Sequence, residues 1–308
     1  MTRALGIVLG HLADRRLGDP RRGHPVALFG SLAATLEKQV YADSRRRGLL
    51  HLTLLGGAVA GGGLVLERAT RDHPVAHTLA TAAATWTVLG GTTLGREATA
   101  VHGFLAADDL PGARQRLTHL VGRDTSVLDE SEVSRATVES VAENTSDAVV
   151  APLVWGAVGG IPGLLGYRAA NTLDAMVGHR GARYGRFGWA SARFDDLLNL
   201  PGARLSGVLA AVLAPLVGGS PRRALAAWTR DARHHPSPNA GVVEAAFAGA
   251  LGVCLGGRNH YAYGVEDRVR LGDGPPPTKD DIARAVRLAD VVSAGAVAVA
   301  ALAAARRA

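Results

Sequence analysis

The sequence has 308 residues, of which 47% are apolar and 5% aromatic, and its formal net charge is +7. Its single cysteine, Cys254, excludes an intrachain disulfide and a metal site built from cysteines. The basic residues form no block interleaved with aromatic residues, which argues against nucleic acid as a partner; the positive excess suits a protein that faces a membrane or handles anions.

Long stretches without Asp, Glu, Lys or Arg decide the class of protein. They lie between Arg47 and Glu67, Asp72 and Arg96, Asp147 and Arg168, Arg204 and Arg222, and from Val291 to Ala305. At about 1.5 Å per residue, most of them can cross the roughly 30 Å of hydrocarbon in a bilayer. We therefore predict an all-α polytopic integral membrane protein of about four to six segments, some of them re-entrant, at 48–66, 74–95, 148–167, 205–221 and 288–305.

The same runs could be buried helices of a soluble all-α bundle, but several runs of nearly spanning length favour the membrane. Two shorter runs, Ala4 to Ala13 and Ala245 to Gly257, are too short to assign. The first has a poor signal-peptide profile, so we expect it to remain on the mature protein. Small residues four apart within 56–61 favour close contact with another helix. We expect residues 1–308 to form a single membrane domain.

Charge next to the apolar runs predicts the topology. The arginines 45–47 directly precede the first long run, so the positive-inside rule places them, and after two crossings also residues 96–147, in the cytoplasm. If 148–167 crosses simply, the arginine-rich loop 168–203 faces the outside. Because Gly159-Gly160-Ile161-Pro162-Gly163 interrupts that segment, a re-entrant hairpin that returns to the cytoplasm is our hypothesis.

Three carboxylates precede this segment at helical spacing. Glu139, Glu143 and Asp147 lie at i, i+4 and i+8, so a helix places them on one face. Such like charges are tolerated if a cation or a cationic substrate shares them, and oxygen ligands suit Mg²⁺ better than zinc. Asn144 adds an amide donor and acceptor nearby. A solvated acidic helix face explains the spacing equally well, so magnesium remains a hypothesis at this point.

A second polar strip follows the segment. Arg168, Asn171 and Asp174 are three residues apart and share one side of a helix, where they would present a guanidinium, an amide and a carboxylate together. Arginine is well shaped for bidentate contact with phosphate. An arginine at a membrane border can equally extend its charge toward the lipid headgroups.

A third polar strip contains two adjacent aspartates, Asp195 and Asp196, which point in different directions on a helix. Asp196 has the better spacing to Asn199 and Arg193. We therefore expect Asp196 to be the functional residue, and the other aspartate to be a cap or an ion-pair partner.

A fourth polar strip, His234-His235-Pro236-Ser237-Pro238-Asn239, precedes an apolar stretch. The two prolines fix an extended turn, and the helix N-terminus that follows could receive an anion. Ser237 or Asn239 could equally be an ordinary N-cap, and the adjacent histidines lack metal-ligand spacing. The sequence has no Walker loop, kinase signature, nucleophile elbow or dinucleotide fingerprint, which excludes the standard nucleotide-binding folds.

Taken in order, the polar segments resemble the adenosylcobinamide-phosphate synthase (CobD/CbiB) family. The matching segments are Gly18-Asp19-Pro20 with His24-Pro25-Val26, ESVAENTSDAVVAPL from 139, YRAANTLDAMVGHR from 167, YGRFGWASARFDDLLNLPGARL from 184, HPSPNAG from 235 and LGG-x-N from 255. The resemblance covers nearly the whole chain, and its most specific block runs from Glu139 to Arg204.

This resemblance implies a ligase of cobalamin (vitamin B12) biosynthesis in the inner (plasma) membrane. Such an enzyme joins adenosylcobyric acid to (R)-1-aminopropan-2-ol phosphate, or to aminopropanol, with ATP as co-substrate and Mg²⁺ as cofactor. The expected partners are the corrinoid and amine substrates and membrane lipids, with other late cobalamin enzymes as further candidates.

The roles of the site residues are assigned on this resemblance. We expect catalytic roles for Glu143, Asp147, Asp174 and Asp196. We expect Mg²⁺ on Glu139, Glu143 and Asp147. Substrate or phosphate contacts are expected from His24, Asn144, Arg168, Asn171, Arg193, Asn199, Ser237 and Asn239.

Two other functions stay open. One is a non-enzymatic membrane sensor, because a branch resembling the AmpE signalling protein shares the scaffold. The full set of charged motifs argues against it, since a sensor need not retain so many ionisable groups. The other, weaker alternative is a membrane transferase that acts on lipid phosphate.

Overall fold

The computed structural model describes residues 1–20, 23–179, 181–261 and 264–306. It confirms the predicted all-α membrane architecture. Within the described ranges, four helices are long and apolar enough to cross a membrane, judged by length and composition: Arg45–Thr70, Glu130–Val177, Trp189–Val217 and Lys279–Arg306. The chain divides into two compact units, which we call unit 1 (Met1–Gly90, Asp147–Gly202 and Val297–Ala308) and unit 2 (Gly91–Ser146 and Ala203–Ala296).

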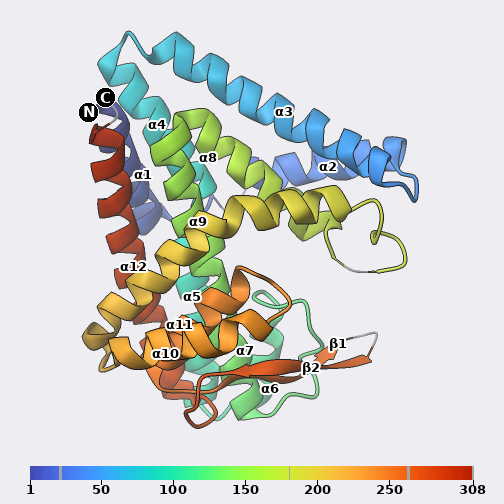
Figure 1. The fold of residues 1–308 in the computed structure, drawn as a ribbon, viewed down its shortest axis with the longest axis vertical. Helices are drawn as coiled ribbons and strands as arrows, with labels where there is room; N and C mark the ends of the chain where they lie inside the picture. Colours follow the sequence, from blue (N-terminus) through green and yellow to red (C-terminus); the bar gives the residue numbers. More distant parts are fainter. Residues whose placement is uncertain (21–22, 180, 262–263, 307–308) are drawn as a thin grey trace. The chain divides into compact units, whose positions relative to one another are not determined.

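Neither unit is one continuous stretch of chain (Figure 1). Unit 1 contains α1 (Thr2–Leu17), α2 (Pro25–Val40), α3 (Arg45–Thr70), α4 (Pro74–Val88), α8 (Ala151–Val177), the first part of α9 (Trp189–Leu213) and the end of α12 (Lys279–Arg306). Unit 2 contains α5 (Gly91–Ala106), α6 (Leu110–Leu117), α7 (Glu130–Thr145), the rest of α9, η2 (Ala214–Val217), α10 (Pro221–Asp231), η3 (Ala232–His234), α11 (Ala240–Leu251), β1 (Leu255–Tyr261), β2 (Gly264–Leu271) and most of α12.

The helix boundaries refine the predicted membrane segments. Segments 48–66, 148–167 and 288–305 lie within three of the four long helices. Segment 74–95 is not one helix, because α4 ends at Val88 and α5 begins at Gly91. Segment 205–221 begins in the second half of a helix that starts at Trp189, and it extends past the end of that long helix at Val217 to the first residue of α10.

Small residues bring the helices of unit 1 close together. A Cβ atom at Gly6 or Gly10 of α1 would meet a threonine side chain of α4, so these two helices pack with almost no side chain between them. The tightest approach of α3 to α8 is at Gly63, where a Cβ atom would lie 2.9 Å from Pro162 Cα. Gly57, in the stretch where we expected close packing, faces open space. The contact that 56–61 predicted therefore lies mainly further along α3.

The long helix α8 is broken where the glycines and Pro162 predicted an interruption. Gly160 has φ 64° and ψ −146°, a conformation that glycine adopts without strain. Beyond the break, the Leu164 side chain packs against Gly156, which residues eight apart in a straight helix could not do. The backbone N–H of Ile161 donates to the Glu67 carboxylate of α3 at 2.6 Å. The second half of α8 is thus capped by a side chain from another helix.

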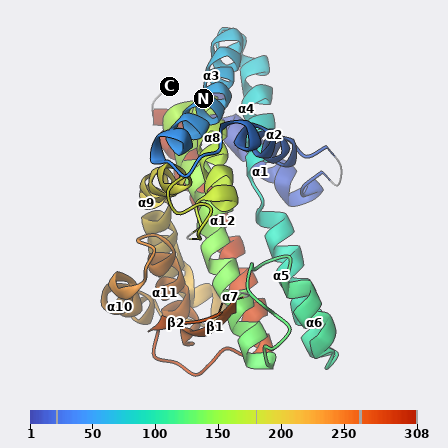
Figure 2. The ribbon, with the colours of Figure 1, turned by 90° about the vertical axis from the view of Figure 1, so that its right-hand side faces the viewer.

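In unit 2, α5 and α6 follow one another alongside α7 (Figure 2). The β-hairpin formed by β1 and β2 was not predicted. Its second strand alternates Val265, Val269 and Leu271 with charged residues, the period of a strand. The first strand contains a bulge at Gly256, whose positive φ of 79° and contact with the Val269 carbonyl leave no room for a side chain.

Candidate functional site

Helix α7 carries the acidic face that the sequence predicted. It begins with a capping box, in which the side chains of Asp129 and Glu132 each accept a hydrogen bond from the other's backbone N–H. The helix is buried from Val133 to Ala142. Charged side chains inside a buried helix need partners.

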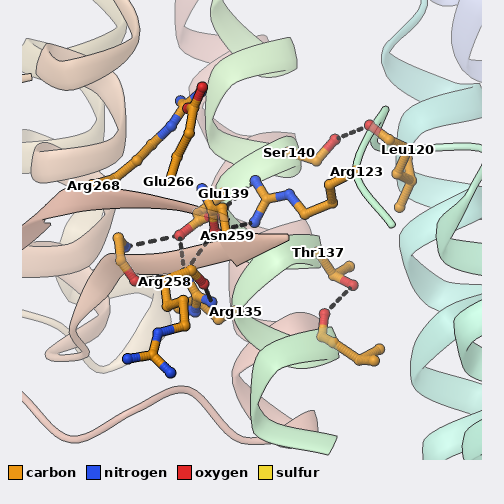
Figure 3. Close-up of polar contacts among 12 residues, drawn as sticks. Leu120, Arg123, Arg135, Thr137, Glu139, Ser140, Arg258, Asn259, Glu266 and Arg268 are labelled. Carbon is orange, nitrogen blue, oxygen red and sulfur yellow. Dashed lines mark hydrogen bonds and ion pairs between the residues drawn. The ribbon is translucent and has the colours of Figure 1, made fainter. Parts of the chain in front are cut away.

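Those partners surround Glu139, which is 5% exposed (Figure 3). Its Oε2 accepts a hydrogen bond from Arg123 at 2.9 Å. Its Oε1 accepts from the Gly256 backbone N–H at 2.8 Å and lies 3.4 Å from an Arg135 nitrogen. Both oxygens are therefore occupied by protein donors, and the carboxylate anchors the hairpin to α7.

Asn259 completes this anchor from β1. Its Oδ1 accepts hydrogen bonds from Arg123 at 2.8 Å and from Arg135 at 3.1 Å. Arg135 also donates to the backbone carbonyls of Gly256 and Arg258 at 2.5 and 2.6 Å. The two guanidinium groups thus bind the first strand as well as Glu139, which fixes the position of the hairpin in unit 2.

A cavity of about 230 Å³ lies beside this anchor, entirely within unit 2. Its polar lining combines three carboxylates, two guanidinium groups, an imidazole and a hydroxyl: Glu139, Glu143, Glu244, Arg123, Arg268, His235 and Ser140. An enclosed mixture of acids and bases is a feature of sites that bind charged ligands.

Glu244 enters the cavity from α11, in which every residue is buried. Its side chain makes no hydrogen bond to any of the described residues. Burial raises the pKa of Glu244 well above its usual range; Glu139 and Glu143 add to the rise, whereas Arg268 and Arg123 oppose it. The group is therefore held in its neutral form more strongly than an exposed glutamate.

His235 presents an imidazole nitrogen to the same cavity. Its Nδ1 lies 3.1 Å from the backbone N–H of Ser237 and 3.2 Å from the carbonyl oxygen of the same residue, so either neutral tautomer fits, and Nε2 can donate or accept a hydrogen bond. Nε2 is buried and has no partner in the described part of the chain. Burial lowers the pKa of His235, which keeps the ring neutral. Gly241 allows this arrangement, because a side chain there would collide with the His235 Cβ.

Acidic and basic groups both line the cavity. Glu139 is paired with Arg123 and Arg135. Glu143 and Glu244 add two carboxyl groups, and Arg268, which also lies 3.6 Å from Glu266, adds a guanidinium group. The cavity therefore presents both carboxyl and guanidinium groups outside the Glu139 anchor.

The carboxyl groups of the cavity are not arranged as a metal site. Among the described residues, no group of three or more His, Cys, Asp and Glu side chains could hold a metal ion. Both oxygens of Glu139 accept hydrogen bonds from protein donors, and the π-helical turn Ser146–Val150 interrupts the helical spacing that aligned Asp147 with Glu143. The arrangement does not fit a resident Mg²⁺, and a direct contact of Glu139, Glu143 and Asp147 with Mg²⁺ stays a prediction.

Unit 1 contains a separate polar network between α8 and α9. The Tyr167 hydroxyl donates to Asn199 Oδ1 at 2.7 Å, and Asn199 donates to Asp195 at 2.9 Å. Asn171 donates to the other oxygen of Asp195 at 3.3 Å and lies 3.4 Å from an Arg168 nitrogen. The predicted residues Arg168, Asn171 and Asn199 are thus connected through Asp195.

Two residues of the N-terminal motif belong to unit 1 as well. His24 caps α2 by accepting a hydrogen bond from the Val26 N–H at 3.1 Å, and its other ring nitrogen lies 3.6 Å from Asp19. Asp19 and Asp147 both act electrostatically on Arg168. His24 therefore has a structural role that its motif did not reveal.

The structure places the two adjacent aspartates in different surroundings, and the choice of Asp196 as the functional residue stays a prediction. Asp195 is 7% exposed and joins the network, whereas the half-buried Asp196 faces the exposed Arg193 at 3.5 Å. The hydrogen bond to Asn199 is made by the aspartate four residues earlier on the helix, Asp195. Asp174 lies half-buried in the last turn of α8, next to Gly178.

Three further predicted residues make local contacts. The Ser237 hydroxyl accepts hydrogen bonds from the backbone N–H groups of Asn239 and Ala240, so it caps α11, as one of the two interpretations of its motif proposed. Asn239 accepts a hydrogen bond from Arg204 at 2.7 Å. Asn144 donates to the Ser140 carbonyl one turn back on α7. In these contacts all three residues stabilise the local backbone or bind a neighbouring side chain.

The sequence analysis did not assign roles to Arg123, Arg135, Glu244, Arg268 or the buried Asn259. Asn259 lies in the LGG-x-N segment, and Glu244 is an isolated acid next to an apolar run. Both signals were present, because a charge inside an apolar helix is costly unless it has a use. The i, i+4 spacing of Arg135 and Glu139 on α7 was a signal for an ion pair, but the contacts of Arg123 and Arg135 with β1 gave none, since those partners are distant in sequence.

The four long apolar helices and the charged cavity of unit 2 define a helical membrane protein with a polar cavity. Comparison with known proteins gives its family. The model of the CobD/CbiB protein family matches residues 7–289. The chain is 54% identical over 307 residues to the cobalamin biosynthesis protein CobD of Mycobacterium tuberculosis H37Rv, covering 99% of this chain and 97% of that protein.

Two more distant relatives agree. The cobalamin biosynthesis proteins CobD of Geobacter metallireducens and Rhodobacter capsulatus are 47% and 46% identical, over 90% and 89% of this chain and 89% of each relative. No solved structure matches the chain. The chain belongs to the CobD/CbiB family, whose named members are proteins of cobalamin biosynthesis.

Proposed function

We propose that the protein is an adenosylcobinamide-phosphate synthase of the inner membrane. It forms an amide bond between the free carboxyl group of adenosylcobyric acid and the amine of (R)-1-aminopropan-2-ol phosphate, at the expense of ATP. Membership of the CobD/CbiB family supports the pathway, and the four long apolar helices support the location in a membrane.

The observation that carries the chemistry is the cavity of unit 2, in which guanidinium groups and the carboxyl groups of Glu143 and Glu244 meet. Amide formation handles anions and must also remove a proton from an ammonium group before the amine can attack. A carboxyl group whose pKa is raised toward neutrality is suited to that transfer, and Glu244 is such a group. A signalling protein would have no comparable need for these buried charges.

The unit 1 network is the second region that we propose to contact substrate. It brings a guanidinium, two amides and a carboxylate together at Arg168, Asn171, Asn199 and Asp195. Guanidinium and amide groups suit the phosphate and amide substituents of large polar substrates. We propose Mg²⁺ as the partner of ATP, since this ion commonly binds substrate phosphates with few protein ligands.

The test is product formation by the purified protein in detergent. Adenosylcobyric acid, aminopropanol phosphate, ATP and Mg²⁺ are combined, and the amide product is measured by mass spectrometry. We expect a product of the mass of adenosylcobinamide phosphate that depends on ATP. If no amide product forms with any corrinoid acid, the proposal is wrong and the sensor alternative gains support. Asp147→Asn and Asp174→Asn should lose product but still insert into membranes.

A further inference from the structure

The size of the cavity in unit 2 restricts its ligand. Its volume of about 230 Å³ is smaller than the roughly 300–1,000 Å³ of pockets that enclose drug-sized molecules. A corrin macrocycle is larger than such molecules, and a complete nucleoside triphosphate also exceeds this space. The cavity therefore takes a ligand of fewer atoms than either of these substrates.

The lining restricts the charge of that ligand. The guanidinium of Arg268 is a donor, and the buried Nε2 of His235, which has no partner in the described chain, can donate in one of its tautomers. Acceptors come from Glu244 and Glu143, for whose carboxyl groups no hydrogen bond to a described residue is found. A guanidinium favours an anionic oxygen and an ionised carboxyl favours a cation, so one ligand that satisfies both carries both charges.

We propose that this cavity binds a small phosphate-bearing primary amine, with the phosphate toward Arg268 and His235 and the ammonium group toward Glu244 and Glu143. Resting on the proposed function, this ligand is the aminopropanol phosphate substrate. The site is then distinct from the unit 1 network and leaves the larger substrates to other parts of the molecule.

Binding of the ammonium group changes the protonation of the cavity. In the free protein, burial and the neighbouring Glu139 and Glu143 raise the pKa of Glu244, while Arg123 and Arg268 moderate that rise. An ammonium group beside the carboxyl favours the ionised form. Ligand binding should therefore release protons from Glu244, up to one per ligand.

Isothermal titration calorimetry of the full-length protein in detergent tests this site without ATP or corrinoid. The three probes are aminopropanol phosphate, isopropyl phosphate, which lacks the amine, and 1-aminopropan-2-ol, which lacks the phosphate. We expect the complete ligand to bind at least tenfold more tightly than either fragment. Titrations in two buffers of different ionisation enthalpy should show proton release with both amines and none with isopropyl phosphate.

Two variants separate the two halves of the site. Glu244→Gln should weaken aminopropanol phosphate binding at least tenfold, abolish proton release, and leave isopropyl phosphate binding within twofold of wild type. Arg268→Gln should weaken both phosphates and leave 1-aminopropan-2-ol unchanged. Glu130→Gln and Arg270→Gln, at exposed positions of α7 and β2, are the matched controls and should bind like wild type. Thermal melting confirms that each variant is folded.

Binding within twofold of wild type in both Glu244→Gln and Arg268→Gln would overturn the proposed site. If Glu244→Gln does not fold, the partly exposed Arg268 still decides the outcome, since its loss must reduce phosphate binding. Ligation assays distinguish the two proposals. Product formation with an unchanged KM for the amine in both variants rejects the site and retains the synthase. Binding as described, without ligation of any corrinoid acid, retains the site and rejects the synthase.

Discussion

The Glu67 carboxylate, in the last turn of α3, accepts a 2.6 Å hydrogen bond from the backbone N–H of Ile161, the first residue after the break in α8. The same carboxylate pairs with Arg3 of α1 at 2.6 Å. The Glu67 side chain thus accepts a hydrogen bond from an otherwise unpaired backbone N–H at the start of the second half of α8. It also connects α1, α3 and α8 of unit 1. A helix N-terminus also carries a partial positive charge, which favours an anion at this position.

Glu67→Ala should therefore lower the free energy of unfolding by about 2 kcal/mol, the range for a lost hydrogen bond to a charged group. Unfolding of the purified protein by denaturant or heat measures the loss. Asp72→Ala is the control, because the side chains of Asp72 and its partner Arg71 are exposed and their 3.6 Å ion pair contributes little. Equal effects of the two substitutions would contradict the capping role.

The break itself gives a second test, through two adjacent glycines. Gly160→Ala adds a Cβ atom at a positive φ and against the Glu67 carboxylate, so it should destabilise the protein by roughly 2 kcal/mol or more. A Cβ at Gly159 meets nothing within 4 Å, and Gly159→Ala should be neutral or slightly stabilising because alanine favours helix. Melting temperatures of the two variants give the comparison; similar temperatures would argue against the break.

The adjacent aspartates of α9 provide a third test. Asp195→Asn places an amide among the Asn171 and Asn199 donors and leaves a buried donor without an acceptor, at a cost of about 1–3 kcal/mol. We expect its product yield to fall at least tenfold. Asp196→Asn removes an ion pair with the exposed Arg193 and should retain most activity. A greater loss in Asp196→Asn would restore the assignment that the sequence favoured.

A fourth prediction distinguishes a structural role of Glu139, as the counter-charge of two arginines, from a role as a metal ligand. Glu139→Gln leaves the guanidinium groups of Arg123 and Arg135 without their buried counter-charge, which should lower the free energy of unfolding by about 3 kcal/mol. Excess Mg²⁺ should not restore product formation by the variant. If higher Mg²⁺ does restore it, Glu139 is a metal ligand after all.

The raised pKa of Glu244 gives a fifth prediction, on pH. Between the unfolded pKa, about 4.3 for glutamate, and the higher folded pKa, the folded protein holds a proton that the unfolded chain has lost. The stability contributed by Glu244 is complete below this window and is lost as the pH rises through the folded pKa. Glu244→Gln should then gain stability relative to wild type as the pH increases.

Melting temperatures of both proteins from pH 4.5 to 8 measure this difference, with Glu130→Gln controlling for the substitution itself. The groups that set the window are Glu139 and Glu143 on α7, Arg123 before α7 and Arg268 on β2. A difference between wild type and Glu244→Gln that does not change with pH would show that Glu244 is not held neutral.

The long helices could be predicted from the sequence because a bilayer requires long apolar runs, and the break at Gly160 because glycine and proline interrupt helices for local reasons. The hairpin could not be predicted in the same way. Its first strand, Leu255–Tyr261, includes two glycines and has no clear apolar alternation, and its position depends on Arg135 and Asn259. Local patterns contain no information about such pairings.

In the candidate site, too, the sequence could predict contacts within one helix but not contacts between segments that are distant in sequence. Helical spacing correctly placed Arg168 next to Asn171 on one side of α8. It could not choose Asp195 over Asp196, since both lie within reach of Asn199 on an ideal helix and the packing of α9 against α8 decides which one is buried. It could indicate Arg135, one turn before Glu139 on α7, as a partner of that carboxylate, but not Arg123, which lies in a loop outside the α7 pattern.

The bond between Glu139 and the Gly256 backbone also affects how the protein is made. The two residues are 117 positions apart, so at roughly 5–20 residues per second the ribosome adds Gly256 on the order of ten seconds after Glu139. During that interval Glu139 can form ion pairs with Arg123 and Arg135, which are already synthesised, but not its hydrogen bond to Gly256. Because β2, which lines the cavity with Arg268 and Val269, comes later still in the sequence, the cavity of unit 2 can be completed only after most of the chain has been synthesised.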